Sequence, residues 1–397
     1  MILRIVIKIS LFSFFLFCNS ILLGDQKYKD LKVFEDALGI IENQYIEQVE
    51  NKRLIENAIN GMLTSLDPYS AFLNKEEYDD MKIATKGEFG GIGVEVKDEQ
   101  GLLKIVSAYK NLPAYKAGIR TGDIIVAIDD ETVGGLSYTQ SVDRLKGELG
   151  ASVRLKVYKE SGELQDYKVI RESIKVIPTK ILFFHQDMMI YIKIGSFNDK
   201  TSNILKAELL KMFNNHKIVK GIILDLRDNP GGMLDQAVEV SQLFLSSGNI
   251  VTLKTKNDSE EMIYEASNNE IAKGVPMVIL INNGSASASE IVAGALQDNH
   301  RALVMGEKSY CKGLIQNIIP FVNGSAIKIT VAKFYTPSGR SIQEDCIIPD
   351  IEVKKHISNQ ENINDKTIKD LRLQDYVLQR AIDLLKGIGF YQHNMEK

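Results

Sequence analysis

Cysteine and histidine are scarce in this sequence, and their scarcity narrows the chemistry that the chain can perform. Of 397 residues, three are cysteine and five are histidine. No cysteine–histidine cluster has the spacing of metal ligands, so a zinc enzyme is disfavoured and we expect neither a metal nor a cofactor. Only Cys311 and Cys346 lie beyond the N-terminal segment. Two cysteines permit one disulfide bridge and do not require it.

The chain also lacks an excess of charge of one sign and, beyond its N-terminus, any apolar run long enough to span a membrane. The formal net charge is −4 and the lysines and arginines are spread throughout, which argues against nucleic-acid binding. Hydrophobic residues make up 44% and charged residues 25%, the balance of a soluble globular protein. A chain of 397 residues is too long for one ordinary core, so two or more domains are expected.

The N-terminus differs from the rest of the chain. Arg4 and Lys8 precede an apolar stretch over residues 9–23, and polar residues follow at once. This order is typical of a secretory signal and predicts export to the cell envelope or periplasm, with residues 1–24 as the signal peptide. The alternative is an uncleaved segment that anchors the protein to the inner membrane. Cys18 could mark a lipoprotein, but the bulky residues before it disfavour that interpretation.

Residue patterns divide the remaining chain into four segments. The first repeats apolar residues at helical spacing and is compatible with a homodimer. The second is punctuated by glycine and rich in strands, and the third alternates strands with helices as an α/β layer does. The predicted segments are an N-terminal helical region (25–84), a β-rich module (85–172), an α/β core (173–357) and a C-terminal helical tail (358–397).

Ser287 lies where an apolar strand, Val275 to Ile281, gives way to a helix of small residues. Backbone N–H groups in the first turn of a helix are unpaired and can bind an anion. A serine at such a junction can attack a carbonyl while neighbouring N–H groups receive the oxyanion. The alternative is structural, because Ser287 and Glu290 match a capping box, which begins many helices without any catalysis.

A serine nucleophile needs a base, and the histidines do not supply one. His300 is nearest in sequence, yet it lies 13 residues after Ser287, or roughly 20 Å along a helix. The G-x-S-x-G elbow is absent too. A lysine can replace histidine only when its amine is neutral, which requires a pKa of roughly 7–8 instead of about 10.4. Lys312 has an apolar setting without an adjacent acid, although most lysines of this chain are expected to be solvated.

A second junction of strand and turn contains two glycines. Residues 221–226 have the pattern of a buried strand, and Gly231-Gly232 follow it. The bare backbone N–H groups of such a pair can approach a ligand closely. The alternative is a tight turn without a functional role.

Taken in order, these segments resemble the C-terminal processing peptidases, also called tail-specific proteases, from about residue 34 to residue 353. The motifs that carry the resemblance are Leu66-Asp67-Pro68-Tyr69-Ser70, Phe89-Gly90-Gly91-Ile92-Gly93, Asp225-Leu226-Arg227-x-Asn229-Pro230-Gly231-Gly232, Gly284-Ser285-Ala286-Ser287-Ala288-Ser289-Glu290, Lys312-Gly313 with Gln316, and Tyr335-Thr336-Pro337-Ser338-Gly339-Arg340. Each motif alone is weak, but the ordered combination is specific. The resemblance implies an α/β (crotonase/ClpP-like) protease core with an inserted β-rich PDZ domain and flanking N- and C-terminal helices.

The resemblance also implies a serine endopeptidase with a Ser-Lys dyad. Its catalytic residues would be Ser287 as nucleophile, Lys312 as base and Gln316, which orients the lysine. Cleavage would take place near the C-termini of protein substrates that have accessible, apolar tails. The PDZ domain would bind the tail and gate the site.

Two groups of backbone N–H donors follow from the same resemblance. An oxyanion hole would combine the N–H of Ala288 with one from the Gly231-Gly232 turn, and the sequence does not choose between the glycines. The PDZ domain would capture the terminal carboxylate of the substrate in a glycine turn. The residues of that turn are Gly90, Gly91, Ile92 and Gly93.

Two departures from the family pattern bear on activity. The family usually has a glycine where this chain has Cys311, so Lys312 would be misplaced if the φ of that glycine were essential. Related members often carry Arg-Gly after the PDZ helix, where this chain has Lys146-Gly147. Lysine keeps the charge but not the bidentate fork of arginine, so a gating contact there would be weaker.

Two other classes of function stay open. The protein could be a non-catalytic peptide-binding protein, with an active PDZ domain on a protease-like scaffold. It could also be a hydrolase or lyase of small acyl compounds, because related folds host unrelated chemistry. The PDZ-like insertion argues against this last alternative.

Overall fold

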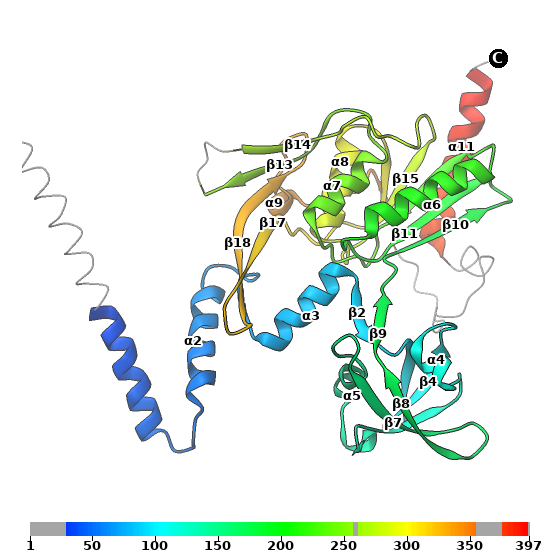
Figure 1. Ribbon diagram of the computed structural model, residues 1–397. Helices are drawn as coiled ribbons and strands as arrows, with labels where there is room; N and C mark the ends of the chain where they lie inside the picture. The colour runs from blue at the N-terminus through cyan, green and yellow to red at the C-terminus, as the bar shows by residue number, and fades with distance from the viewer. Residues whose placement is uncertain (1–28, 257–260, 355–374, 396–397) are drawn as a thin grey trace, which may run out of the picture. The chain divides into compact units, whose positions relative to one another are not determined.

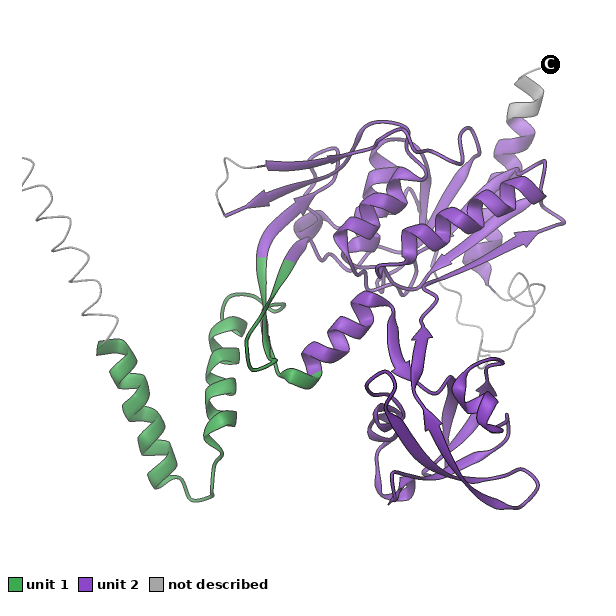
Figure 2. Ribbon diagram, viewed as in Figure 1, with its two compact units in different colours: residues 1–76, 316–330 green, residues 77–315, 331–397 purple. Residues whose placement is uncertain are grey.

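The computed structural model describes residues 29–256, 261–354 and 375–395. Two compact units divide the chain, one formed by residues 1–76 with 316–330 and the other by residues 77–315 with 331–397 (Figure 2). The predicted signal peptide or anchor lies outside the described residues. No helix within the described ranges is long and apolar enough to cross a membrane.

The smaller unit begins with helices. Residues 29–44 are helical, and α2 (Asn51–Thr64) follows. Asp67 then directs a turn, because its carboxylate accepts hydrogen bonds from the backbone N–H groups of Tyr69 and Ser70, both at 2.8 Å. The next residues form a short strand that the predicted helical region did not include, since three residues are too few to show an alternating pattern. This strand, β1 (Ala71–Leu73), pairs with the start of β18 (Ala326–Tyr335), which also pairs with β17 (Leu314–Pro320).

The α/β core of the larger unit is built on a sheet in the order β10-β11-β12-β15-β16-β19. Figure 1 labels three of these strands, β10, β11 and β15. Only β10 runs antiparallel to its neighbour. Every residue of β12 and β15 is buried, as expected of parallel strands covered on both faces. The strands are β10 (Thr179–Phe184), β11 (Met189–Ile194), β12 (Gly221–Asp225), β15 (Met277–Ile281), β16 (Leu303–Gly306) and β19 (Ile351–Glu352).

Helices cover both faces of this sheet. On one face, Ile222 and Ile279 pack into a core with three helices, and on the other face Ile223 and Val278 pack against a single helix. Successive strand residues point to opposite faces, so each central strand contributes to both cores. The first three helices are α6 (Thr201–Asn215), α7 (Leu234–Gln242) and α8 (Ala288–Asp298), and the single helix is α11 (Tyr376–Met395).

A smaller sheet completes the core. Strand β13 (Asn249–Thr255) pairs antiparallel with β14 (Glu261–Glu265) and with residues 332–335 of β18. Helix α9 (Ile342–Asp345) follows β18 and has only four residues.

The β-rich module has its own sheet, in the order β3-β4-β5-β7-β8, with the two-residue strand β6 paired to β5. Its apolar side chains form a core separate from the two above, with Ile105, Ile125 and Leu155 fully buried. Its elements are β3 (Val94–Glu99), β4 (Leu102–Ala108), α4 (Pro113–Ala117), β5 (Ile124–Ile128), α5 (Tyr138–Leu145), β7 (Ser152–Tyr158) and β8 (Leu164–Ile170).

The chain enters and leaves this module through one ribbon. Strand β2 (Glu88–Gly91), which follows α3 (Lys75–Lys86), pairs antiparallel with β9 (Glu172–Lys175). An insertion of this kind leaves the order of the core strands undisturbed. The predicted domain boundaries at 85 and 172 stay predictions.

The packing of α11 on the sheet generates a test of stability. Leu385 is 1% exposed, and a β-carbon added to Gly221 of β12 would lie 2.9 Å from its Cδ1. We expect Leu385→Ala to lower the free energy of unfolding by about 2–5 kcal/mol, because it removes buried methyl groups and leaves a cavity. Chemical denaturation followed by circular dichroism measures the change. Phe390→Ala is the control on the same helix, since Phe390 is 73% exposed and its loss should change stability by less than about 0.5 kcal/mol. Equal effects of the two variants would show that α11 is not packed as described.

Candidate active site

Ser287 occupies the junction that its sequence context predicts. Strand β15 ends at Ile281, α8 begins at Ala288, and Ser287 lies between them as the N-cap, half-buried. Its φ is 55° and its ψ is −112°, a conformation that residues with a β-carbon seldom adopt. Strain of this kind concentrates at functional sites, and a strained serine between strand and helix is also the feature of the G-x-S-x-G elbow. The chain therefore reaches an elbow-like backbone without that motif.

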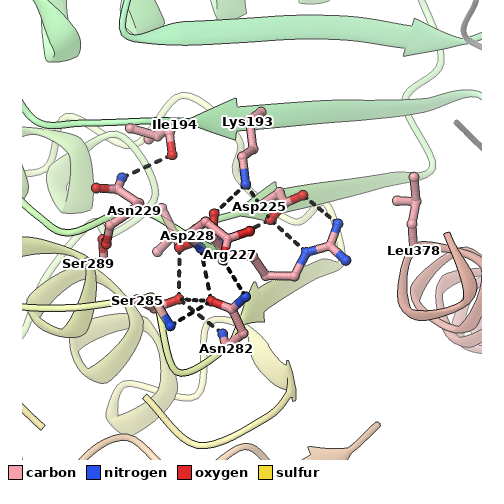
Figure 3. Close-up of polar contacts among 12 residues, drawn as sticks. Lys193, Ile194, Asp225, Arg227, Asp228, Asn229, Asn282, Ser285, Ser289 and Leu378 are labelled. Atoms are coloured by element: carbon pink, nitrogen blue, oxygen red, sulfur yellow. Dashed lines mark hydrogen bonds and ion pairs between the residues drawn. The ribbon is translucent and has the colours of Figure 1, made fainter. Parts of the chain in front are cut away.

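Hydrogen bonds join the turn after β15 to the turn after β12 (Figure 3). The Ser285 hydroxyl donates to the backbone oxygen of Leu226 at 2.8 Å. The Asn282 amide both accepts from the backbone N–H of Asp228, at 2.9 Å, and donates to its carboxylate, at 2.8 Å. Because β12 and β15 are parallel neighbours, their carboxyl ends meet at the same edge of the sheet. The two motifs that sequence analysis singled out are thereby held together.

Asn229 is fully buried and fixes the glycine turn. Its side-chain NH2 donates to the backbone oxygen of Ile194 at 3.0 Å, and its side-chain oxygen accepts from the N–H of Gly231 at 2.9 Å. Its backbone oxygen accepts from the N–H of Ala286, at 3.0 Å, and from the Ser289 hydroxyl, at 2.9 Å. One side chain and its carbonyl thus connect the glycine turn with both sides of Ser287.

The two glycines differ in what their backbone can offer. Gly231 has φ 103°, and a β-carbon on it would lie 2.9 Å from the β-carbon of Ser287 and 3.0 Å from the nitrogen of Ala288. Only glycine fits this close approach. Its N–H already donates to Asn229, whereas no hydrogen bond between described residues involves the N–H of Gly232. Gly232 is therefore the glycine with an N–H left for a ligand.

A network of ion pairs around the buried Asp225 supports the same turn, and Figure 3 shows its members Lys193, Asp225 and Arg227. Arg227 donates to both carboxylate oxygens of Asp225, at 2.9 and 2.6 Å, and to both of Asp375, at 3.0 and 2.6 Å. Burial alone would raise the pKa of Asp225, but the charges of Arg227 and Lys193 and the hydrogen bonds it accepts lower it to about 2. Asp375 immediately precedes α11, so this network also fixes where that helix starts. The sequence motif identified Asp225 and Arg227 but gave no sign of Asp375.

Glu290 is the residue that joins the serine turn to the lysine segment. It is fully buried, and its carboxylate accepts hydrogen bonds from four donors. Burial raises the pKa of Glu290 against the effect of these donors, which favour the ionised form. The capping interaction expected from the sequence is present as the first of the four. The donors are the backbone N–H of Ser287 (2.7 Å), of Cys311 (2.7 Å) and of Lys312 (2.9 Å), and the hydroxyl of Ser309 (2.6 Å).

Lys312 is half-buried on the segment between β16 and β17. Besides Glu290, this segment contacts the serine turn through the N–H of Tyr310, which donates to the backbone oxygen of Ser285 at 3.0 Å. On the other side, Gly313 packs against α9: its N–H donates to the Gln343 side chain at 3.0 Å, and a β-carbon on it would lie 2.3 Å from the Gln343 nitrogen. The backbone of the predicted base is thus fixed next to that of the predicted nucleophile.

Cys311 stands where the family usually has a glycine, and it adopts a positive φ as a glycine could. Its φ is 76°, in the left-handed region that glycine occupies most easily. It forms a disulfide with Cys346, a bridge that the sequence permitted but did not require. The lysine segment therefore keeps a glycine-like path without a glycine.

Gln316 belongs to the smaller unit, formed by residues 1–76 and 316–330. Its side-chain amide donates to the hydroxyl of Thr330 at 3.3 Å. Its role in orienting Lys312 stays a prediction. No group of three or more histidine, cysteine, aspartate or glutamate side chains in the described part of the chain is arranged to hold a metal ion.

In the β-rich module, the expected glycine turn is only partly a turn: Gly90 and Gly91 are the last residues of β2 and pair with β9, and only Ile92 and Gly93 link β2 to β3. Carbonyl groups of this segment are used internally. The oxygen of Gly90 accepts from the N–H of Gly147 at 3.0 Å, and that of Ile92 from the N–H of Ala114 at 2.8 Å. A β-carbon on Gly90 would lie 2.1 Å from the oxygen of Gly147. Ile92 and Gly93 lead into β3, an edge strand of the sheet. The ammonium of Lys146, where the family often has arginine, pairs with Asp143 at 2.8 Å.

Comparison with known families supports the same assignment for three parts of the chain. Residues 189–353 match the model of peptidase family S41. Residues 104–159 match a PDZ domain, which identifies the β-rich module. Residues 22–77 match the N-terminal domain of the activating protease CtpB.

Individual relatives agree with these matches. The carboxy-terminal-processing protease of Bartonella bacilliformis is 39% identical over 353 residues, which cover 88% of this chain and 81% of that protein. A probable CtpA-like serine protease of Staphylococcus epidermidis is 35% identical over 336 residues, which cover 83% of this chain and 67% of the relative. Among solved structures, the photosystem II D1 C-terminal processing protease is 27% identical, with a TM-score of 0.46 over 81% of this chain and 92% of that one.

The predicted fold class, an α/β protease core with an inserted PDZ domain, is confirmed by the sheet topology and by these matches. The alignment with the Bartonella bacilliformis protease covers 88% of this chain, and so extends well beyond any one of the three matched regions. The chain belongs to peptidase family S41 and is a serine protease of its C-terminal processing group.

Proposed function

We propose that the protein is an endopeptidase that cleaves protein substrates near their C-termini, with Ser287 as nucleophile and Lys312 as general base. The observation that carries this proposal is the Glu290 carboxylate, which binds the backbone of both residues. A helix cap needs only the hydrogen bond that Glu290 accepts from the backbone N–H of Ser287. The further bonds from Cys311 and Lys312 join the lysine segment to the serine turn. This link supports a site in which the two side chains act as a pair.

The proposed reaction uses residues of this chain only. The neutral amine of Lys312 accepts the proton of the Ser287 hydroxyl as its oxygen attacks the carbonyl of the scissile peptide bond. The resulting ammonium donates that proton to the leaving amine, which departs and leaves an ester on Ser287. A water molecule, deprotonated by the same lysine, then hydrolyses the ester and frees the serine.

The developing oxyanion needs donors that are fixed before the reaction begins. The N–H of Ala288 lies in the first turn of α8, where backbone donors are unpaired and the helix dipole favours negative charge. The second donor is the N–H of Gly232, because the N–H of Gly231 is committed to Asn229. The role of Gly231 is then steric, since it lets the turn lie against Ser287.

The PDZ domain would select the substrate. Its β3 strand is at the edge of the sheet, where an extended peptide can add as a further strand. N–H groups of the segment from Gly90 to Gly93, at the end of β2 and in the link to β3, would receive the terminal carboxylate, since carbonyl groups of this segment accept from internal donors. Apolar tails are the class expected for such a groove. A gating role of this domain belongs to the same proposal.

The site of action follows from the N-terminal segment. A signal over residues 1–24 would place the protease in the cell envelope or periplasm, either released or anchored to the inner membrane. Its substrates would then be exported proteins. Pairing of the N-terminal helices into a homodimer is a further part of this proposal.

Substitution of the two proposed catalytic residues tests the mechanism. Ser287→Ala and Lys312→Ala should each lower the cleavage rate of an unfolded protein with an apolar C-terminus by at least about 10³-fold, as loss of a nucleophile or its base does in other serine proteases. Lys308→Ala is the matched control, because Lys308 is exposed and lies on the same segment. Near-normal cleavage by Lys312→Ala would rule out the dyad. If the wild type binds the tail without turnover, the protein is better described as a non-catalytic peptide-binding protein. If it turns over only a small acyl ester, it is better described as a hydrolase of small acyl compounds.

The role of the tail carboxylate has its own test. Two peptides that differ only in a free or an amidated C-terminus should share one kcat, while the amidated peptide has a KM higher by roughly 10- to 100-fold. Amidation removes the negative charge that the segment from Gly90 to Gly93 would bind, a loss worth roughly 1.5–3 kcal/mol for a charged hydrogen bond. Steady-state kinetics on the wild type measures both constants. If the two peptides have equal KM values, the segment from Gly90 to Gly93 does not bind the terminal carboxylate.

A further inference from the structure

The segment that carries Lys312 runs alongside the segment that contains α9, and three links join them. The outer two are pairs of hydrogen-bonded groups, and the middle one is the disulfide, with 4.3 Å between its α-carbons. The middle link is covalent and is formed by the residue immediately before Lys312. The three pairs are Ser309 with Ile347 (3.1 and 2.8 Å), Cys311 with Cys346, and Gly313 with Gln343 (3.0 Å).

Both cysteines have a backbone conformation that a side chain disfavours. Cys311 has φ 76° and Cys346 has φ 58°. Residues with a β-carbon keep such angles only when their surroundings impose them. The bridge supplies that constraint to both residues at once, because neither can rotate to a negative φ without moving the other. Rotation at Cys311 would carry Lys312 with it, since φ of one residue sets the direction of the next.

The helix on the far side of the bridge cannot supply the constraint by itself. α9 has four residues, and helices so short are not stable without external contacts. Cys346 is its C-cap, so the disulfide fixes the end of the helix on which Gly313 packs. Both sides of Lys312 thus depend on the position of Cys346.

We propose that the Cys311–Cys346 disulfide is a positioning element for the general base, and that its reduction lowers turnover while the fold persists. This proposal rests on the proposed role of Lys312. The bond holds the segment in the path that a glycine would allow, and so maintains the lysine in register with Ser287. Activity is then highest in an oxidising compartment, where such bridges persist.

The reduction step is an ordinary thiol–disulfide exchange. Cys311 is half-buried and Cys346 is 1% exposed, so a thiolate of a small dithiol attacks the sulfur of Cys311 and expels Cys346 as thiolate. The second thiol of the reagent then breaks the mixed bond and leaves as a cyclic disulfide. Two electrons and two protons pass to the cysteines, which end as free thiols.

The test compares the oxidised wild type, the wild type reduced with dithiothreitol, and two variants of the full chain. Reduction and Cys346→Ala should each lower kcat by about tenfold and leave KM unchanged, because the substrate-binding PDZ domain is not affected. Reoxidation should restore the wild type alone. Cys311→Gly combined with Cys346→Ala should regain most of the lost kcat and be indifferent to the reductant, because glycine adopts φ 76° without a bridge.

The double variant separates positioning from mere cross-linking. It lacks the bridge but has a glycine that adopts the required φ, so any effect of the reductant on this variant arises elsewhere in the chain. A double variant as slow as Cys346→Ala would overturn the proposal, and so would a reduced wild type, with free thiols verified by mass spectrometry, that keeps its full kcat. Failure of the dyad itself is distinguishable, because Lys312→Ala would then cleave the same substrate in either redox state.

Discussion

The structure depends above all on one buried carboxylate. Glu290 lies in the first turn of α8, yet most of its hydrogen bonds go to a segment about twenty residues further along the chain. A carboxylate taken out of water must find donors or else become neutral, and here four donors surround it. Three of the four are backbone N–H groups, so the carboxylate fixes the path of the main chain and not only a side-chain contact. The backbone around the proposed nucleophile and the proposed base therefore depends on a residue that has no assigned role in the reaction.

The α/β core explains why these segments meet at all. Parallel strands bring their carboxyl ends to one edge of the sheet, and the turns after β12 and β15 emerge there side by side. The polar contacts of these turns use Ser285 and Asn229, which the sequence showed only as members of motifs, and Asn282, which lies outside those motifs. The Arg227 network ties the turn after β12 to the start of α11. This turn is thus held both by the turn after β15 and by α11.

The fold class could be predicted from the sequence and is confirmed, whereas the roles of the candidate residues stay predictions. Both predictions combine local patterns with the ordered motifs of the family. Apolar runs of five residues predict buried strands, and a serine between such a strand and a helix is visible in the order of the letters. The remaining features depend on contacts between distant segments. The motif does not show that the side chain of Asn229 accepts a hydrogen bond from the N–H of Gly231, or that Ser287 has a positive φ. Asp375 lies 148 positions from its partner Arg227, and its role could not be read from either neighbourhood. The bridge between Cys311 and Cys346 could be named as a candidate, but pairing requires the fold.

The ribbon of β2 and β9 has a consequence for how the chain can fold. Residues 92–171 leave the core and return to it through two strands that are hydrogen-bonded to each other. The entropy of closing a loop grows only with the logarithm of its length, and here the ends of the loop are already joined by the ribbon. For the protease core, the entropy cost of this large insertion is therefore close to that of a short hairpin. The core and the inserted domain can each reach their native state without waiting for the other, and a domain of different specificity could occupy the same ribbon without altering the topology around Ser287.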